Sequence, residues 1–301
     1  MQEKSLGIPE SMTLVSRVQD YVQLTKFRLS TLVVFSAAMG YVIGMGSSFS
    51  WYTLGLLSLG GFLVTGASNA FNQVIEKDLD KLMDRTMNRP LPAGRMSTTE
   101  ALIAAFFMGI SGVAILWFQV DELCGLLALL SLLLYALVYT PSKKVTPFSV
   151  MIGAVPGAFP PLLGWIAARH EIGLEGLVLY AVQFIWQFPH FWAIAWVLHD
   201  DYLKAGFKML PNGGERNKAS AFQTLVYTIC LVPMALIPKM FGFTGMFTTI
   251  LMLLCGVMFT LQAVRLYRDM EMKSAQRLMF GSFIYLPVVQ IIWMLSKLFS
   301  I

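Results

Sequence analysis

Residues 51–94 read WYTLGLLSLGGFLVTGASNAFNQVIEKDLDKLMDRTMNRPLPAG, and within this stretch an apolar run passes directly into a charged one. Residues 51–75 contain no charged side chain. About 20 mostly apolar residues are enough for a helix to cross the hydrocarbon core of a bilayer. Four acidic side chains follow between Glu76 and Asp84, and two arginines come directly after them. The stretch therefore predicts a membrane-spanning helix that ends in a polar site.

The rest of the chain repeats the apolar pattern. Of its 301 residues, 56% are hydrophobic and 13% are charged, and its mean hydropathy is +0.66. The charged share is about half of the roughly 25% that is usual in soluble domains. Nine stretches are long and apolar enough to span: Leu29–Gly46, Trp51–Ile75, Ala101–Phe118, Leu123–Thr140, Phe148–Ala168, Leu174–Leu198, Ala219–Phe241, Phe243–Leu266 and Leu278–Ser300.

These spans are expected to be helices, because lipid offers the backbone polar groups no other partner. The runs also lack the alternating pattern of an outer-membrane barrel. We therefore expect an all-α integral membrane protein in which residues 1–301 form one domain. About nine transmembrane helices would surround a central cavity that opens to the cytoplasmic side.

The distribution of basic residues predicts the topology. Nineteen of the 22 Lys and Arg fall in the N-terminal tail or in the even-numbered links between spans. Because cytoplasmic loops are enriched in Lys and Arg, the short polar tail of residues 1–26 is expected in the cytoplasm, and the C-terminus on the outer side of the inner membrane. Topology also accounts for the net charge of +5, so no nucleic-acid partner is expected. Residues 1–28 show no signal-peptide pattern.

The polar part of the opening stretch has the composition of a metal and phosphate site. Asn72, Glu76, Asp80 and Asp84 are spaced four residues apart, so a continuing helix would carry them on one stripe. Like charges at that spacing repel, and a hard divalent cation relieves the repulsion. Mg²⁺ suits the site because it takes one or two carboxylates and completes its shell with waters and substrate phosphates.

Two arginines complete this composition. Arg85 and Arg89 follow the acids, and guanidinium groups match phosphate oxygens. The alternative is a solvated cytoplasmic link whose arginines only follow the topology rule. That rule does not account for the acids, because it is nearly indifferent to Asp and Glu.

These residues resemble the first signature of the UbiA-type intramembrane prenyltransferases. That signature has an Asn and two acids, each four residues apart, followed by a tail like the RTMNRPLPAG of residues 85–94. The resemblance implies that Asn72, Glu76 and Asp80 hold Mg²⁺ and act in catalysis with Arg85 and Arg89. Glu76 departs from the pattern, because the family more often has Asp there.

A second element of the family is a Tyr followed four residues later by a Lys. Tyr139 and Lys143 match it, and Lys144 comes next. The resemblance implies that Lys143 contacts diphosphate and acts in catalysis, with Tyr139 and Lys144 as substrate-binding candidates. On local grounds, a lysine pair placed only by topology is an equally good explanation.

A third element of the family limits which acceptor substrate is expected. Most of the family has a second acidic signature after the sixth span, but four and eight residues before Asp201 this chain has Val197 and Ala193. Instead, residues 186–211 (WQFPHFWAIAWVLHDDYLKAGFKMLP) and 153–165 (GAVPGAFPPLLGW) resemble the heme O synthase group of the family. That resemblance extends from about residue 20 to about residue 295.

His190 is the candidate for heme contact in this group. A His within an apolar span is a functional candidate by default, either as an iron ligand or as a propionate partner. The alternative is a His that bonds a neighbouring helix beside Pro189. Asp201 and Tyr202 are further substrate-binding candidates, whereas His199 is expected to be structural.

The resemblance implies that farnesyl diphosphate reacts with a vinyl group of heme B, with addition of water, to give heme O and diphosphate. Heme A synthase would be a downstream partner, and membrane lipid the surroundings. In this mechanism the cations stabilise the leaving group, and aromatic side chains of the sixth span shield the allylic cation. One alternative is a family member that acts on an aromatic or quinone-precursor acceptor. Another is a heme-handling or transport protein without catalysis, which would carry charges at mid-span.

Overall fold

A computed structural model describes residues 14–46 and 48–299, and every regular element in these ranges is helical. The elements are α1 (Leu14–Leu24), α2 (Phe27–Gly44), α3 (Trp51–Asp80), α4 (Thr98–Ile115), η1 (Leu116–Val120), α5 (Glu122–Leu133), η2 (Leu134–Tyr139), α6 (Thr140–Val145), α7 (Ser149–Gly157), α8 (Phe159–Arg169), α9 (Leu174–Val197), α10 (His199–Lys204), α11 (Pro211–Gly214), α12 (Lys218–Met234), α13 (Ile237–Met240), α14 (Met246–Asp269) and α15 (Met272–Phe299). The elements η1 and η2 are π-helical segments.

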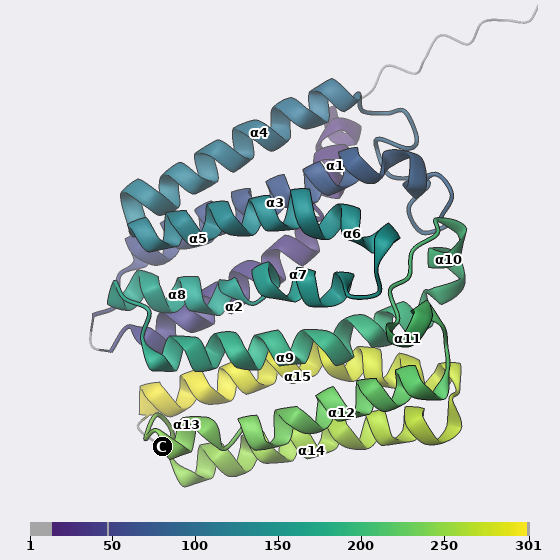
Figure 1. Cartoon of the computed structure of the whole chain (residues 1–301). Coiled ribbons are helices and arrows are strands. Elements are labelled where there is room, and N and C mark those ends of the chain that lie inside the picture. Colours follow the sequence, from purple (N-terminus) through teal and green to yellow (C-terminus); the bar gives the residue numbers. More distant parts are fainter. Residues whose placement is uncertain (1–13, 47, 300–301) are drawn as a thin grey trace, which may run out of the picture.

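The predicted bundle of nine spans is confirmed. In the described ranges, nine helical stretches are long and apolar enough to cross a membrane. They lie roughly side by side, and the short elements α6, α10 and α11 gather at one end of the bundle (Figure 1). The loop after α3 and the start of α12 lie at that end too, so the segments richest in Lys and Arg meet there.

Within the N-terminal tail, residues 14–24 form the helix α1, while residues 1–13 lie outside the described part of the chain. One local expectation was wrong. The helix α3 ends at Asp80, so Asp84 does not continue the acidic stripe. The chain turns after Lys81, where the hydroxyl of Thr86 donates a hydrogen bond to the backbone carbonyl of Asp80 at 2.9 Å.

The fifth span is broken by its prolines into α7 and α8. Pro161 has no N–H, so the carbonyl of Gly157 loses the partner that a continuous helix would supply. The side-chain amide of Gln183 on α9 donates to that carbonyl at 2.8 Å. Ser36 and Gln290 bond the same Gln183, so this polar cluster joins α2, α9 and α15 inside the membrane.

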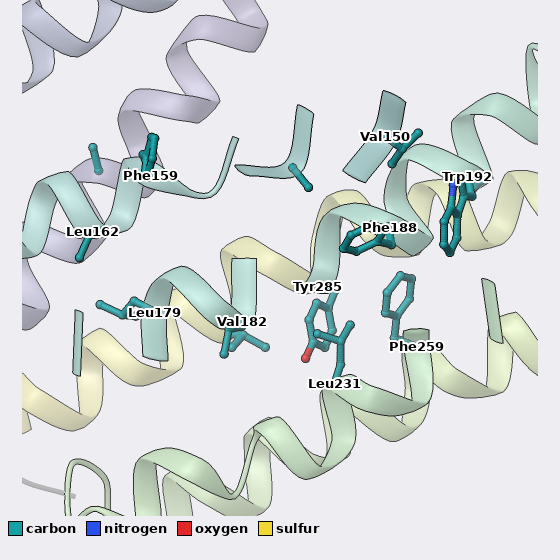
Figure 2. Packing of buried hydrophobic residues seen from close by; sticks show 14 of the residues in the cluster. Val150, Phe159, Leu162, Leu179, Val182, Phe188, Trp192, Leu231, Phe259 and Tyr285 are labelled. Carbon is teal, nitrogen blue, oxygen red and sulfur yellow. The ribbon is translucent and has the colours of Figure 1, made fainter. Parts of the chain in front are cut away.

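Apart from this polar cluster, most of the side chains buried around α9 are apolar. Figure 2 shows Phe188 and Trp192 of α9 between Val150 of α7 and the aromatic rings of Phe259 and Tyr285. All five side chains are buried. Since lipid tails are as apolar as the core, close packing rather than exclusion of water holds such helices together.

Glycines permit close packing of the fifth span against α2. A Cβ added at Gly164 would lie 1.9 Å from the carbonyl oxygen of Ala37 on α2. One added at Gly40 would lie 2.0 Å from the carbonyl oxygen of Pro161. The backbones of α2 and α8 therefore touch at these glycines.

We predict that Gly164→Ala destabilises the protein by about 1–3 kcal/mol, the usual effect of overpacking. The added methyl group would have to push the two backbones apart. The matched control is Gly55→Ala on α3, where a Cβ would meet nothing within 4 Å and the better helix propensity of Ala should be neutral or stabilising. Thermal unfolding in detergent measures both, and equal midpoints would contradict the packing argument.

Candidate active site

The three proposed metal ligands lie buried on one face of the last turns of α3. Asn72, Glu76 and Asp80 are 1%, 4% and 1% exposed. Burying a charged group in such a place is unfavourable unless a partner compensates it. Each of the three side chains has a cationic partner from a different segment of the chain, described next.

Lys143, Arg89 and Lys26 are these partners. The ammonium nitrogen of Lys143 is 2.9 Å from Oε1 of Glu76, and a guanidinium nitrogen of Arg89 is 2.7 Å from Oδ2 of Asp80. Lys26 donates to Oδ1 of Asn72 at 3.2 Å. Two carboxylates thus face three cations, so the cluster keeps an excess positive charge that suits an anionic ligand.

The π-helical segment η2 directs Lys143 into the cluster. The hydroxyl of Thr140 donates to the carbonyl of Tyr135, five residues back, and accepts from the amide of Asn72 at 3.3 Å. The Lys143 ammonium lies 4.7 Å from the centre of the Tyr139 ring, within cation–π range. Tyr139 is therefore beside the site, as expected of a substrate-binding candidate, whereas Lys144 is exposed.

Arg85 and Arg89 take different positions. Arg89 turns back into the cluster, while Arg85 is exposed and its guanidinium carbon is 5.8 Å from the centre of the Tyr202 ring. Arg85 and Tyr202 therefore form a pair at the rim. Asp84, beside them, pairs with Lys204 of α10 at 2.5 Å.

Asp201 holds this rim in place. Its carboxylate accepts the backbone N–H groups of Asp84 and Arg85 at 2.8 and 3.3 Å. Partial burial raises the pKa of Asp201, but these hydrogen bonds and the nearby Lys204 outweigh burial and hold it below its usual range. The carboxylate therefore stays ionised and ties α10 to the arginine segment.

Lys26 is the site residue that sequence reasoning missed, because it was assigned to topology alone. It adopts a left-handed conformation, with φ of 47°, between α1 and α2. The amide of Asn69 donates to the carbonyl of Thr25, and the amide of Gln73 to that of Leu24, so α3 holds this elbow. Burial, together with the cations Arg89 and Lys143, lowers the pKa of Lys26 to about 7.

None of the contacts described for His190 involves the carboxylate cluster. Its Nδ1 atom is 2.8 Å from the hydroxyl of Ser282 on α15, and its ring stacks on Trp186 with 4.4 Å between centroids. Phe191 and Phe283 meet the ring edge-on. The hydrogen bond to a neighbouring helix, which was the structural alternative for His190, is thus present. It uses Nδ1 and leaves Nε2 for a ligand. Nε2 of His199 donates a hydrogen bond to the backbone carbonyl of Gly214 at 3.0 Å, which is a structural contact.

The donor set of the cluster fits Mg²⁺. Among the described residues no three His, Cys, Asp or Glu side chains converge, so the available ligands are two carboxylates and the amide oxygen of Asn72. Mg²⁺ commonly binds one or two carboxylates and takes its other ligands from water and substrate phosphates. In addition, Oδ1 of Asp80 is buried and has no hydrogen-bond partner in the described part of the chain. A divalent cation held by this carboxylate would satisfy it.

An apolar cavity of about 580 Å³ lies between α3, α4, α5 and the two π-helical segments, and it is open on the side of the exposed residues Phe106, Ile110 and Phe118. Two of its lining residues, Phe71 and Ala136, are close in the sequence to Asn72 and Thr140 of the site. Aromatic lining was expected from the sixth span. The aromatic rings of this cavity come instead from α3, α4 and η1: Phe71, Phe106, Trp117 and Phe118.

Solved structures share this fold. A digeranylgeranylglyceryl phosphate synthase superposes with a TM-score of 0.78 at 18% identity, covering 93% of this chain and 98% of the other. A UbiA homolog from Archaeoglobus fulgidus bound to GPP and Mg²⁺ has a TM-score of 0.69 at 17% identity, covering 94% and 100%.

Sequence comparison identifies the family. A protoheme IX farnesyltransferase from Cytophaga hutchinsonii is 46% identical over 286 residues, which cover 95% of this chain and 100% of the relative. One from Flavobacterium johnsoniae is 43% identical, covering 95% and 97%. Residues 33–286 match the UbiA prenyltransferase family. The resemblance inferred from the motifs is thus confirmed, and the chain belongs to the UbiA prenyltransferase family.

Proposed function

We propose that this protein transfers the farnesyl group of farnesyl diphosphate to a vinyl group of heme B, with addition of water, to give heme O and diphosphate. The observation that carries the proposal is the buried cluster in which two carboxylates and one amide face three cations. The names of its full-length relatives support the choice of farnesyl donor and heme acceptor. Heme A synthase is the enzyme we expect to use the product.

Asn72, Glu76 and Asp80 would hold Mg²⁺. The metal ion would supply positive charge that neutralises the diphosphate and the negative charge that develops on it as it leaves. The A. fulgidus UbiA homolog, which shares the fold, was solved with GPP and Mg²⁺ bound, and this supports the use of a divalent cation with a prenyl diphosphate. When diphosphate enters, Lys26, Arg89 and Lys143 exchange their carboxylate and amide partners for phosphate oxygens. These cations are in place before the reaction, so they stabilise the leaving group with little reorganisation.

Arg85 and Tyr202 would close the rim over the diphosphate, in a position set by Asp201. Tyr139 keeps Lys143 directed into the cluster. Lys144 is exposed, and we propose only that it attracts the anionic substrate to the site.

The apolar cavity would take the farnesyl chain. Its lining is hydrocarbon and aromatic, so an allylic cation formed there is kept from water and receives support from π faces. The chain would enter past Phe71 and Ala136, which are close in the sequence to Asn72 and Thr140 of the site.

His190 is the proposed ligand of heme iron. Its Nδ1 atom is engaged by Ser282, which orients the ring and leaves Nε2 as the free ligand atom. The hydroxyl of Ser282 donates to the carbonyl of Met279 and so accepts the N–H of His190 Nδ1, which leaves Nε2 of the neutral ring with a lone pair that suits iron rather than a propionate. Because none of the contacts described for His190 involves the cluster, the porphyrin edge rather than the iron would reach the farnesyl group.

The orientation proposed for the protein follows its charges. The end of the bundle that carries the cluster would face the cytoplasm, with the central cavity open to that side. The N-terminus would lie in the cytoplasm and the C-terminus on the outer side of the inner membrane.

Asp80→Asn is predicted to lower farnesyl transfer by at least about 100-fold, the order observed when a group that stabilises developing charge is removed. The assay incubates purified protein with heme B, farnesyl diphosphate and Mg²⁺ and detects heme O by mass. The matched control is Asp78→Asn, since Asp78 lies on the same helix, is exposed and pairs only with Lys81 among the contacts described. Full activity of Asp80→Asn, or without a divalent cation, would refute the site.

Ile110→Trp is predicted to raise KM for farnesyl diphosphate about 10-fold. The larger side chain would fill part of the cavity, and a poorer fit of a substrate in an apolar pocket has an effect of this order. The same substitution at Ile103 serves as control. Ile103 lies two turns earlier on α4 and is similarly exposed, at 65% against 69%, but it does not line the cavity. An equal KM in both variants would place the farnesyl chain elsewhere.

His190→Ala is predicted to abolish the spectral signature of histidine-ligated heme when the protein is titrated with heme B. His170→Ala is the control, because His170 lies at the other end of the bundle and pairs with Asp121. If Ser282 orients the ring, Ser282→Ala should weaken heme binding less than His190→Ala does. An unchanged spectrum in His190→Ala would exclude iron ligation, whatever the outcome for the diphosphate site.

A further inference from the structure

The helix α1 has three distinct faces. Leu14, Val15, Val18 and Val22 form an exposed apolar face and are 82%, 66%, 55% and 44% exposed. Gln19 and Gln23 form an exposed polar face beside it. Asp20 and Leu24 form the buried face, against the bundle. In a soluble protein, a helix that packs one face on the core normally presents polar side chains on its exposed faces. A continuous exposed apolar stripe therefore indicates a further contact surface.

The orientation of these faces is fixed by contacts with the bundle. Arg17 forms an ion pair with Glu100 at the start of α4, at 3.0 Å, and Asp20 accepts from Arg95 at 2.9 Å. At the end of α1, the amide of Gln73 donates to the carbonyls of Gln23 and Leu24. Rotation of α1 about its axis would break all of these bonds, so the apolar face remains directed away from the bundle.

The level of α1 is fixed as well. Only Thr25 and Lys26 separate its last residue from the first span, α2. Its ion-pair partner Glu100 belongs to the first turn of α4, another span. The helix therefore lies at the membrane boundary, on the side of the carboxylate cluster. Phe27, Leu29 and Leu32, at the start of α2, also have exposed apolar side chains.

We propose that α1 is an interfacial helix whose apolar face of Leu14, Val15, Val18 and Val22 is inserted into the headgroup–acyl boundary of the bilayer. Amphipathic helices of this kind bury one face about 5–10 Å into that boundary and leave the polar face in water. The arrangement matches the three faces of α1: bundle on one side, lipid below and water above. It also anchors the elbow at Lys26, which contacts Asn72, to the membrane surface.

The test uses the full chain in lipid nanodiscs with a nitroxide label at Val18→Cys or, as matched control, at the neighbouring Gln19→Cys. The background carries Cys230→Ser, because Cys230 is the exposed one of the three cysteines. Signal from the background without an added Cys is subtracted. Accessibility of the label to oxygen, which concentrates in lipid, is compared with accessibility to a water-soluble nickel complex.

We expect the ratio of oxygen to nickel accessibility to be severalfold higher at Val18 than at Gln19. A label at Val22→Cys should agree with Val18 and guards against a local effect of one substitution. Equal nickel access at both positions would place the apolar face in water and overturn the proposal. Shielding of Val18 from both reagents would do so too, because it would mean that a protein surface covers the face. The measurement needs no catalysis, so its outcome is independent of the proposed reaction.

Discussion

The compensation of charge at the end of α3 is the constraint on which the functional half of the structure depends. Glu76 and Asp80 are almost fully buried at the edge of a membrane, where an unpaired carboxylate would be strongly unfavourable. Each is paired with a cation that another segment supplies. The loop after α3, the π-helical segment η2 and the elbow before α2 all have the positions that these pairs require.

The same pairing prepares the cluster for an anion. The three cations are held close together although they repel one another, and burial together with this repulsion lowers the pKa of Lys26. Such an arrangement is under electrostatic strain until more negative charge arrives. A diphosphate with its metal ion would relieve that strain, so binding of the substrate and stabilisation of the leaving group draw on one electrostatic feature.

The apolar part of the bundle follows a second rule, that no backbone carbonyl within the membrane may lack a partner. Prolines break the fifth span, and the freed carbonyl of Gly157 is satisfied by Gln183 rather than by water. The break lets α8 lie directly against α2 at Gly40 and Gly164. Polar side chains inside the membrane thus bond the backbone carbonyl that the proline leaves without a partner, whereas the polar side chains at the membrane boundary form the site.

The sequence by itself determined the number of spans, the charged end of the bundle, the family, and the place of Asn72, Glu76 and Asp80 on one helical face. These properties are local, because they depend on apolar length and on a spacing of four residues. Only the tertiary structure decided that α3 stops before Asp84, that Lys26 and Lys143 meet the ligands from 46 and 67 residues away, and that His190 bonds Ser282. Those partners depend on how the helices are rotated and packed against each other, and local periodicity carries no information about that.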